Sequence, residues 1–223
     1  YPEESGPFRG DYRDCPKGTP RCKPWLPKTK ARAAEYALEW TDEDGEANTE
    51  DYWYFGNNNC TNFVSQAWFA AGQNAMYENL PRKNWPLNWW AERDRETPYE
   101  GANNNYNWTN VQGFRDQQVK SRRAIVLTEA KTRGKNLKVG DVVVIDFGDD
   151  EVWNHSYIVT QSNEDGRFVS SQTTTRHNFP WEELATEILP RSAQFGSETG
   201  EWEKNAWDWQ IVRPLYKGSN VRR

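Results

Sequence analysis

Catalysis by a thiol needs a cysteine thiolate, a base beside it and a third group that orients the base. In this chain Cys60 is the candidate nucleophile, because it lies at the predicted start of a helix, whose positive end favours the thiolate. The chain has two histidines, and His155, which opens a predicted strand, is better placed as the base than His177, which falls in a predicted loop. A small, unreactive core residue is the alternative interpretation of Cys60.

Other reaction chemistries have little support in the sequence. The two histidines fall in separate predicted elements and lack the spacing of metal ligands, so we expect no metal and no other cofactor. The Gly-x-Ser-x-Gly turn of serine hydrolases is absent from the sequence, and so is a glycine-rich phosphate loop. The thiol of Cys60 therefore remains the main candidate for chemistry.

The other two cysteines, Cys15 and Cys22, flank a short loop that contains proline and glycine. Two close cysteines in such a segment, with a third far away, predict a local disulfide and a free thiol. A disulfide implies an oxidising compartment, so we expect a secreted, extracellular protein. The chain begins at Tyr1 and its one methionine is Met76, which suggests that a leader has been removed or that the chain has been trimmed.

The composition indicates a folded domain and narrows its partners. Aromatic residues make up 14% of the chain and tryptophan alone accounts for 13 residues, whereas disordered chains are poor in rings. The net charge of -5 argues against nucleic acid and against an anionic membrane as the main partner. We also expect no insertion into a membrane, because the sequence has no long apolar run.

Hydrophobic periodicity predicts helices in the first part of the chain and strands in the last part. Helices are expected at 30–40, 60–72 and near 112–119, and strands at 141–147, 155–161, 167–173 and 210–216. Asn59 is a good N-cap for the second helix. The order predicts an α+β fold in which N-terminal helices pack on an antiparallel sheet. We divide the chain into a disulfide-stapled arm (1–29), one domain (30–217) and a tail (218–223).

Several short motifs carry a resemblance to a known family. They are Asn-Cys-Thr-Asn-Phe-Val-Ser-Gln at 59–66, Asn-Trp-Thr-Asn-Val at 107–111, Gly-Asp at 140–141 and His-Ser at 155–156. In this order they resemble the bacterial putative amidase domain family, which is related to the NlpC/P60 cysteine peptidases. The resemblance covers roughly 30–216 and implies a papain-like fold, Cys60 as nucleophile and His155 as base. It also implies secreted action on amide bonds, with cell-wall peptides as the favoured substrate class.

The chain departs from the family pattern at two positions. The family usually has Asp before the cysteine, where this chain has Asn59, and both residues cap helices. After the next hairpin the family commonly has His-Thr, and here Gln172 and Thr173 occupy that place. The third catalytic group implied by the resemblance is therefore the amide of Gln172, whose oxygen can accept a hydrogen bond from imidazole.

Strand register supplies a geometric argument for Gln172. With a hairpin turn centred on 164–165, Thr160 pairs with Val169, and Gln172 falls on the same face as His155 and diagonal to it. Diagonal neighbours lie within reach of a long amide side chain. The register predicts that Gln172, and not His177, orients His155.

A few further residues receive roles near the nucleophile. Thr174 lies directly opposite His155 in the predicted register and is the alternative third group, since a bulge could exchange it with Gln172. The backbone N–H of Cys60 is the expected oxyanion donor, with help from Asn58 or Tyr54. Trp108 and neighbouring rings are expected to line a substrate groove.

Together these observations predict a secreted cysteine hydrolase that cleaves an amide or isopeptide bond through a thioester on Cys60. The expected partner is a peptide or peptidoglycan substrate, and no protein partner is identified. One alternative is acyl transfer to an amine by the same Cys60 and His155 pair. Another is a non-catalytic, tryptophan-rich wall-binding or inhibitory protein on the same fold. Two N-glycosylation patterns, one of them around Cys60, favour a bacterial origin, because a glycan there would block the thiol.

Overall fold

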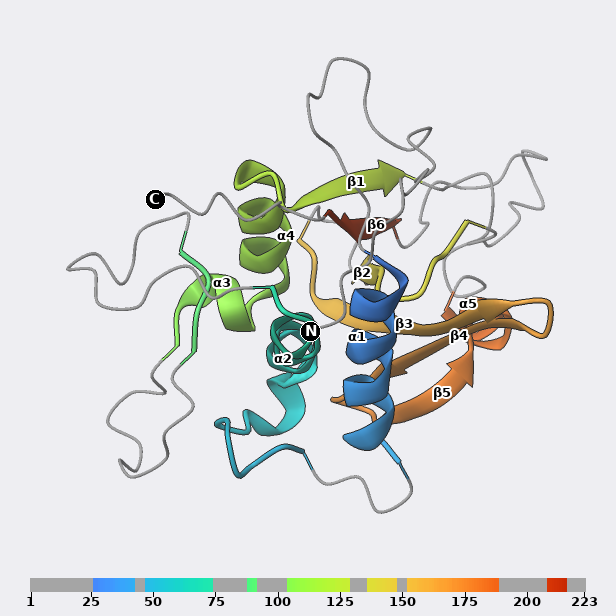
Figure 1. Cartoon of the computed structure of the whole chain (residues 1–223), viewed down its shortest axis with the longest axis horizontal. Helices are drawn as coiled ribbons and strands as arrows, with labels where there is room; N and C mark the ends of the chain where they lie inside the picture. The colour runs from blue at the N-terminus through green and yellow to red at the C-terminus, as the bar shows by residue number, and fades with distance from the viewer. Residues whose placement is uncertain are drawn as a thin grey trace, which may run out of the picture.

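One antiparallel sheet organises the chain, as a computed structural model shows (Figure 1). The structure describes residues 26–42, 47–73, 88–91, 104–128, 136–147, 152–188 and 208–215. In these ranges the sheet has the strand order β1-β6-β2-β3-β4-β5. The strands are β1 (Ala124–Thr128), β2 (Val142–Asp146), β3 (His155–Asn163), β4 (Gly166–Ser171), β5 (Arg176–Pro180) and β6 (Asp208–Pro214).

Helices cover both faces of this sheet. The described ranges hold α1 (Pro27–Glu39), the 3₁₀ turn η2 (Gly56–Asn58), α2 (Cys60–Ala70), α3 (Tyr106–Thr109), α4 (Val111–Lys120) and α5 (Trp181–Ile188). Helices α1 and α2 pack against each other and against β3, and α4 packs against β1. Helix α5 packs against β4 and β5 (Figure 1). The predicted α+β fold, with helices packed on an antiparallel sheet, is confirmed.

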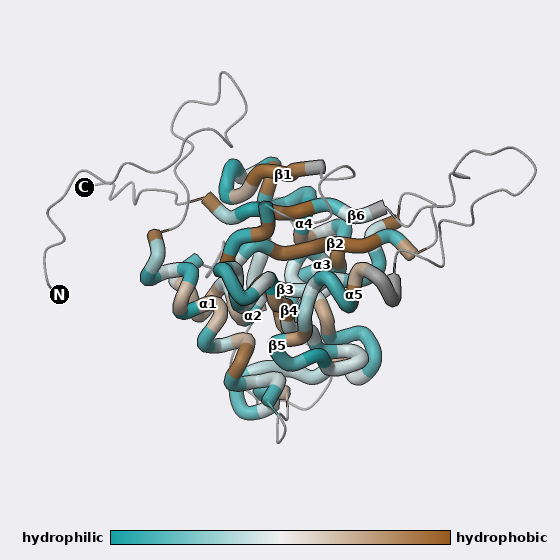
Figure 2. Tube along the Cα trace, turned by 90° about the vertical axis from the view of Figure 1, so that its right-hand side faces the viewer, coloured by the Kyte–Doolittle hydropathy of each residue, from teal (hydrophilic) through white to brown (hydrophobic). Residues whose placement is uncertain are grey.

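Strand β2 shows why the sheet is buried on both faces. Side chains alternate along a strand, so Val142 and Val144 join one hydrophobic cluster while Val143 and Ile145 join another. The first cluster contains the apolar residues of α1 to α4, and the second contains those of α5. A strand buried on both faces reads as a continuous apolar run, which Figure 2 shows as the brown segment of β2. We call the cluster that contains Val142 and Val144 the first cluster, and the one that contains Val143 and Ile145 the second cluster.

A buried ion pair fixes the corner where β2 begins. The Arg213 guanidinium donates to the Asp141 carboxylate from Nε at 3.0 Å and from Nη2 at 2.8 Å, and both side chains are buried. Arg213 also donates to the Asn136 carbonyl at 2.6 Å. The indole of Trp68 donates to the Gly140 carbonyl at 3.0 Å, which ties α2 to the same corner. This corner links β6, β2 and the helix that begins at the candidate nucleophile.

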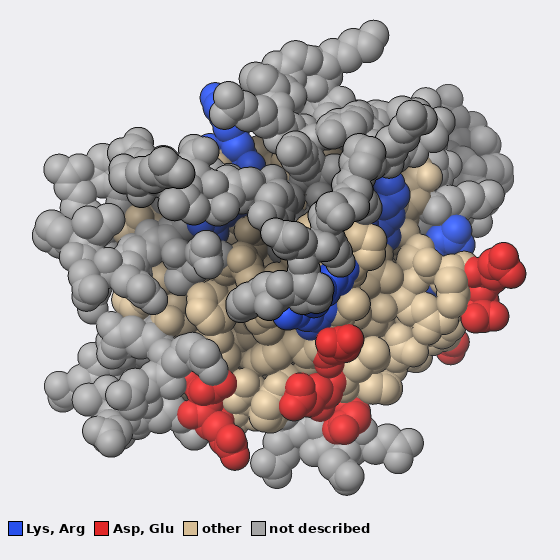
Figure 3. Space-filling model, viewed as in Figure 1, with Lys and Arg blue, Asp and Glu red and all other residues tan. Residues whose placement is uncertain are grey.

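Apart from buried groups such as Asp141 and Arg213, many charged side chains lie on the outside of the domain (Figure 3). Figure 3 shows that, on the face seen in Figure 1, Asp and Glu lie mainly along the lower edge of the view, with Lys and Arg above them. Glu35, Glu39 and Asp42, on α1 and just after it, are exposed. Among the residues described, no helix has the length and apolar character needed to cross a membrane.

Some sequence-based element predictions differ from the structure. Helix α1 begins at Pro27 rather than at residue 30, because proline suits the first helical position, where its missing N–H costs no hydrogen bond. His177 lies on β5 and not in a loop. Strands β1 and β5 and helices α3 and α5 were not expected from the periodicity. Cys15 and Cys22, and the disulfide predicted between them, lie outside the described residues, as does the tail from 218 onward.

Candidate active site

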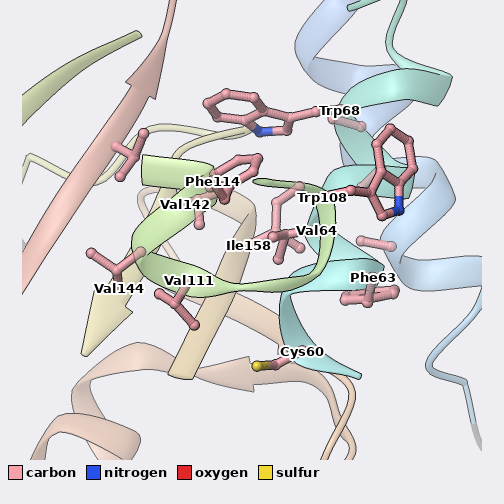
Figure 4. Packing of buried hydrophobic residues seen from close by; sticks show 14 of the residues in the cluster. Cys60, Phe63, Val64, Trp68, Trp108, Val111, Phe114, Val142, Val144 and Ile158 are labelled. Carbon is pink, nitrogen blue, oxygen red and sulfur yellow. The ribbon is translucent and has the colours of Figure 1, made fainter. Parts of the chain in front are cut away.

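Cys60 is the first residue of α2, as the apolar stripe of that helix predicts. Phe63, Val64 and Trp68 are fully buried in the first cluster and hold the helix against the sheet. Cys60 itself is 6% exposed, and its sulfur lies 3.7 Å from the Thr61 hydroxyl. Figure 4 shows Cys60 at the end of the cluster opposite Trp68, with its sulfur turned away from the ring packing. The thiol therefore lies at the margin of the core.

The helix that carries Cys60 begins without the predicted side-chain cap. Asn59 occupies the N-cap position with φ -94° and ψ -4°, and its side chain makes no capping hydrogen bond. Its Oδ1 instead accepts from the Phe55 backbone N–H at 3.1 Å and from the Asn62 amide at 2.9 Å. The predicted N-cap position of Asn59 is confirmed, but the side-chain cap is missing because its amide is engaged by Phe55 and Asn62. A helix start without a cap keeps backbone N–H groups available to an anion.

A network of buried amides surrounds this helix start. The Trp108 indole donates to Asn62 Oδ1 at 2.8 Å, and Asn62 Nδ2 donates to Asn59 Oδ1 and to the Trp53 carbonyl. Asn59 Nδ2 donates to Gln172 Oε1 at 2.5 Å. Every member is nearly inaccessible to solvent apart from the partly buried Trp53. Buried polar groups that are all satisfied rigidify a site, so this network gives the start of α2 a defined position.

The same contacts place Cys60 at one particular end of the sheet. Asn59 N–H donates to the Thr173 hydroxyl at 2.8 Å, and Asn59 Nδ2 reaches Gln172. Both partners follow directly after β4, which runs antiparallel to β3. The residues after β4 therefore lie level with the beginning of β3, which is His155. Cys60 and His155 accordingly lie at the same end of the sheet.

The His155 ring is held by two aromatic side chains. The Phe147 ring stacks on it with centroids 5.8 Å apart, and the Tyr157 ring meets it edge-on at 4.5 Å. Among the described residues, the backbone of His155 pairs with Ile145 in the sheet, whereas its ring makes no hydrogen bond. Burial, with a smaller effect from the Arg176 charge, lowers the pKa of His155 from 6.5 to about 4. The imidazole is therefore neutral at pH 7 and can accept a proton.

The structure does not join the sulfur and the ring directly. Within the described ranges, no hydrogen bond links the Cys60 thiol to His155. Register pairs His155 with Ile145, and both Ile145 and Tyr157 belong to the second cluster, whereas Cys60 belongs to the first. The Cys60 thiol and the His155 ring thus lie at the same end of the sheet but on opposite faces of it. Catalytic hydrogen bonds are often long or poorly aligned without substrate, but the described residues place these two groups on opposite faces, so they form no catalytic pair in this arrangement.

Comparison with known proteins identifies the family. Residues 28–193 match the model of the family described as putative amidase domain. The chain belongs to this family. At a coarse level, membership indicates an enzyme that hydrolyses amide bonds. No curated protein and no solved structure matches the chain.

The two departures from the amidase family pattern lie in contact. Asn59 and Gln172 are the two positions at which the motif resemblance is incomplete, and their amides hydrogen bond to each other. The other end of Gln172 donates from Nε2 to the Trp40 carbonyl at 2.9 Å. Both polar ends of Gln172 are therefore engaged at the start of α2 and at the end of α1.

The register predicted for the hairpin holds only near its turn. Gln161 pairs with Phe168 as expected, but a bulge follows, and Val159, not Thr160, pairs with Val169. The one-residue shift moves Gln172 out of the predicted diagonal position, since a slip of one residue exchanges the two faces of a strand. The register argument for Gln172 beside His155 is therefore wrong.

The remaining predicted site residues take different places in this amidase-family chain. Trp108, expected in a substrate groove, is 1% exposed and forms part of the first cluster. Tyr54 is 46% exposed and Asn58 is also exposed, so both side chains are accessible to solvent. His177 is exposed, with Nδ1 3.3 Å from the Thr41 hydroxyl. Thr174 is exposed in the turn after β4.

Sequence reasoning missed the residues that hold these groups in place. Tyr157 lies two positions after His155, and strand alternation predicts that both share one face, but the contact between the two rings was not predicted. Asn62 lies three positions after Asn59 on the same helix and belongs to the family motif, which could have marked it. Phe147 is the residue directly after β2, at the end of the strand predicted at 141–147, but its contact with His155 was not predicted. In the described part of the chain, no three His, Cys, Asp or Glu side chains gather closely enough to hold a metal ion.

Proposed function

We propose that this amidase-family protein is a cysteine amidase, in which Cys60 attacks an amide carbonyl and His155 is the base. The observation that carries the proposal is the position of Cys60 as the first residue of a helix without a side-chain cap. The partial positive charge at such a helix start stabilises both a thiolate and a developing oxyanion. The family match supports amide hydrolysis as the reaction.

In the proposed reaction, His155 takes the thiol proton as the Cys60 sulfur attacks the carbonyl carbon. The Cys60 backbone N–H, with Tyr54 or Asn58 nearby, donates to the oxyanion. The C–N bond then breaks, the leaving amine takes the proton from His155, and a thioester remains on Cys60. A water molecule, deprotonated by His155, attacks the thioester, releasing a carboxylic acid and restoring the thiol.

The electrostatics of His155 favour a particular timing of proton transfer. Because burial lowers its pKa to about 4, His155 is neutral before the reaction at pH 7. A neutral imidazole supports a thiol that loses its proton during the attack rather than a preformed ion pair. Approach of the sulfur to the ring is the step that substrate binding must complete, since the two are not hydrogen bonded in the described structure.

The substrate and the setting form a finer part of the proposal. The motif resemblance favours an amide or isopeptide bond in cell-wall peptides, a papain-like architecture and a relation to the NlpC/P60 peptidases. Secretion follows from the disulfide proposed between Cys15 and Cys22. Tyr54, which precedes Cys60 in the same segment and is exposed, offers a ring to a sugar or peptide. An amine acceptor in place of water would turn the same steps into acyl transfer.

A second candidate function is a non-catalytic binding or inhibitory protein on the same fold. The missing hydrogen bond between the Cys60 thiol and His155 within the described residues favours it. Such a protein would keep the helix start and the amide network for stability but would not turn over substrate. Thiol reactivity and product release separate it from the enzyme.

Incubation with purified peptidoglycan tests the proposal. We expect release of new amino groups or stem peptides by the wild-type protein and none by Cys60→Ala or His155→Ala. His177→Ala is the matched control, because it removes the other histidine, which is exposed on β5. Turnover of soluble amides with none on wall fragments would overturn the substrate class. Full activity of Cys60→Ala would overturn the mechanism.

A further inference from the structure

We propose that Gln172 is a positioning residue for the nucleophile, which it holds through Asn59, and that it does not act through His155. The contacts that carry this inference are the two hydrogen bonds of the Gln172 amide, one to Asn59 and one to the Trp40 carbonyl. The inference rests on the proposed function, since it takes Cys60 as the nucleophile.

Backbone groups fix the direction of these hydrogen bonds. The Phe55 backbone N–H can only donate, so the Asn59 atom that it meets is the oxygen, and Nδ2 must face Gln172. The Trp40 carbonyl can only accept, so the Gln172 atom that it meets is nitrogen, and Oε1 must face Asn59. Both ends give the same orientation of the amides. The Asn59–Gln172 contact is therefore a donor meeting an acceptor.

A strained turn makes a second connection to the same residue. Thr173 and Thr174 adopt positive φ angles of 67° and 56°, which branched side chains rarely adopt. Such a conformation persists only where surrounding contacts hold it. The Thr173 hydroxyl accepts the Asn59 backbone N–H at 2.8 Å, so the turn is held by the residue that precedes Cys60. The two residues directly after β4 thus both hydrogen bond to Asn59, Thr173 to its backbone N–H and Gln172 to its side chain.

These hydrogen bonds fix the position of the residue that directly precedes α2. Asn59 is joined covalently to Cys60, and its carbonyl accepts the Phe63 N–H at 2.9 Å, the first hydrogen bond of the helix. Gln172 also reaches the end of α1, so it couples α1, α2 and the end of β4 in one contact. An aspartate at position 59 could not donate to Gln172 Oε1. Asn59 and Gln172 are therefore matched to each other as donor and acceptor.

The rate of Cys60 alkylation by iodoacetamide tests the inference without a substrate. We expect Gln172→Met, which keeps the side-chain size but removes both hydrogen bonds, to lower the second-order rate constant about five- to tenfold. The separate variant Gln172→His should react within about twofold of the wild-type rate at pH 8, because a neutral imidazole can accept from Asn59 and donate to the Trp40 carbonyl. Gln161→Met, on the outer part of the hairpin, is the matched control and should leave the rate unchanged.

The decisive comparison repeats Gln172→Met in a His155→Ala background. If Gln172 acts through Asn59, the loss persists there at the same size. If the loss disappears, Gln172 acts through His155 and the inference is overturned, while the proposed function stands. If His155→Ala alone leaves alkylation and turnover unchanged but the Gln172 effect remains, the proposed base fails and the inference stands.

A milder variant guards against loss of folding. Thr173→Val removes the hydroxyl that accepts the Asn59 N–H and keeps the shape of the side chain. We expect it to lower the alkylation rate in the same direction as Gln172→Met, with circular dichroism unchanged. A folded Thr173→Val protein and a folded Gln172→Met protein that both react at the wild-type rate would overturn the inference.

Discussion

A histidine that is buried in its neutral form makes the stability of this domain depend on pH. His155 is 6% exposed, and burial together with the Arg176 charge lowers its pKa from 6.5 to about 4. In the unfolded chain the ring regains its ordinary pKa. Between the two values the unfolded state therefore binds more protons than the folded state, and the free energy of unfolding falls as the pH falls.

The size of this effect follows from the two pKa values. A tenfold difference in proton affinity corresponds to about 1.4 kcal/mol. For pKa values of 6.5 unfolded and about 4 folded, His155 makes the free energy of unfolding about 2 kcal/mol smaller at pH 5 than at pH 7. The contribution of neutral His155 to stability is fully present above its unfolded-state pKa of 6.5 and is lost progressively as the pH falls toward its folded-state pKa of about 4.

Urea unfolding followed by tryptophan fluorescence, at pH 5 and at pH 7, measures this difference. His155→Phe replaces the ring with one of similar shape that can stack on Phe147 and cannot titrate. We expect the variant to lose about 2 kcal/mol of the pH dependence that the wild-type protein shows. His177→Phe is the matched control, because it removes the other histidine, which is exposed.

Equal pH dependence in the wild-type and His155→Phe proteins would mean that His155 titrates alike in the folded and unfolded states. In that case the ring is not held neutral in the core, and the timing of proton transfer proposed above loses its basis. A loss of pH dependence in His177→Phe as large as that in His155→Phe would contradict the assignment of the effect to His155.

Three further outcomes are expected. Arg213→Met leaves the Asp141 carboxylate buried and unpaired, and should lower the free energy of unfolding by about 3–5 kcal/mol in urea titrations. Trp108→Phe removes the donor to Asn62 Oδ1 and should cost about 1–3 kcal/mol, with the loss of a buried hydrogen bond visible as faster amide exchange in α2. Mass spectrometry of unreduced peptides should find the two arm cysteines joined and Cys60 free, and a mixed pairing that includes Cys60 would contradict the assignment.

The sequence predicts those parts of this fold that depend on local pattern. The stripe of Phe63, Val64 and Trp68 places the start of α2 at Cys60, and the turn at 164–165 is where the hairpin reverses. Both follow from periodicity and turn chemistry, which act over a few residues.

The bulge at Thr160 shows where local pattern fails. Its hydroxyl lies 3.2 Å from the Phe168 carbonyl and 2.9 Å from Asn178 Oδ1, so contacts to two other strands accompany the extra residue. Alternation along β3 carries no trace of such contacts. The shifted register then changed the predicted neighbours of His155.

The role of Asn59 shows a second limit. An asparagine before a helix predicts a side-chain cap. Here the Asn59 amide instead accepts from the Phe55 N–H and donates to Gln172. Partners far away in sequence decide the outcome, and a motif alone does not name them. The site could be predicted as far as the residues Cys60 and His155, but not the contacts that hold each in place.

The position of β6 affects how fragments of this protein should be chosen. The family match ends at residue 193, whereas β6 spans Asp208–Pro214 and lies between β1 and β2. A fragment that stops at the end of the match would lack a central strand, would leave two strand edges open to intermolecular pairing and would lose the Arg213 partner of Asp141. Expression trials should therefore treat the last strand as part of the folding unit.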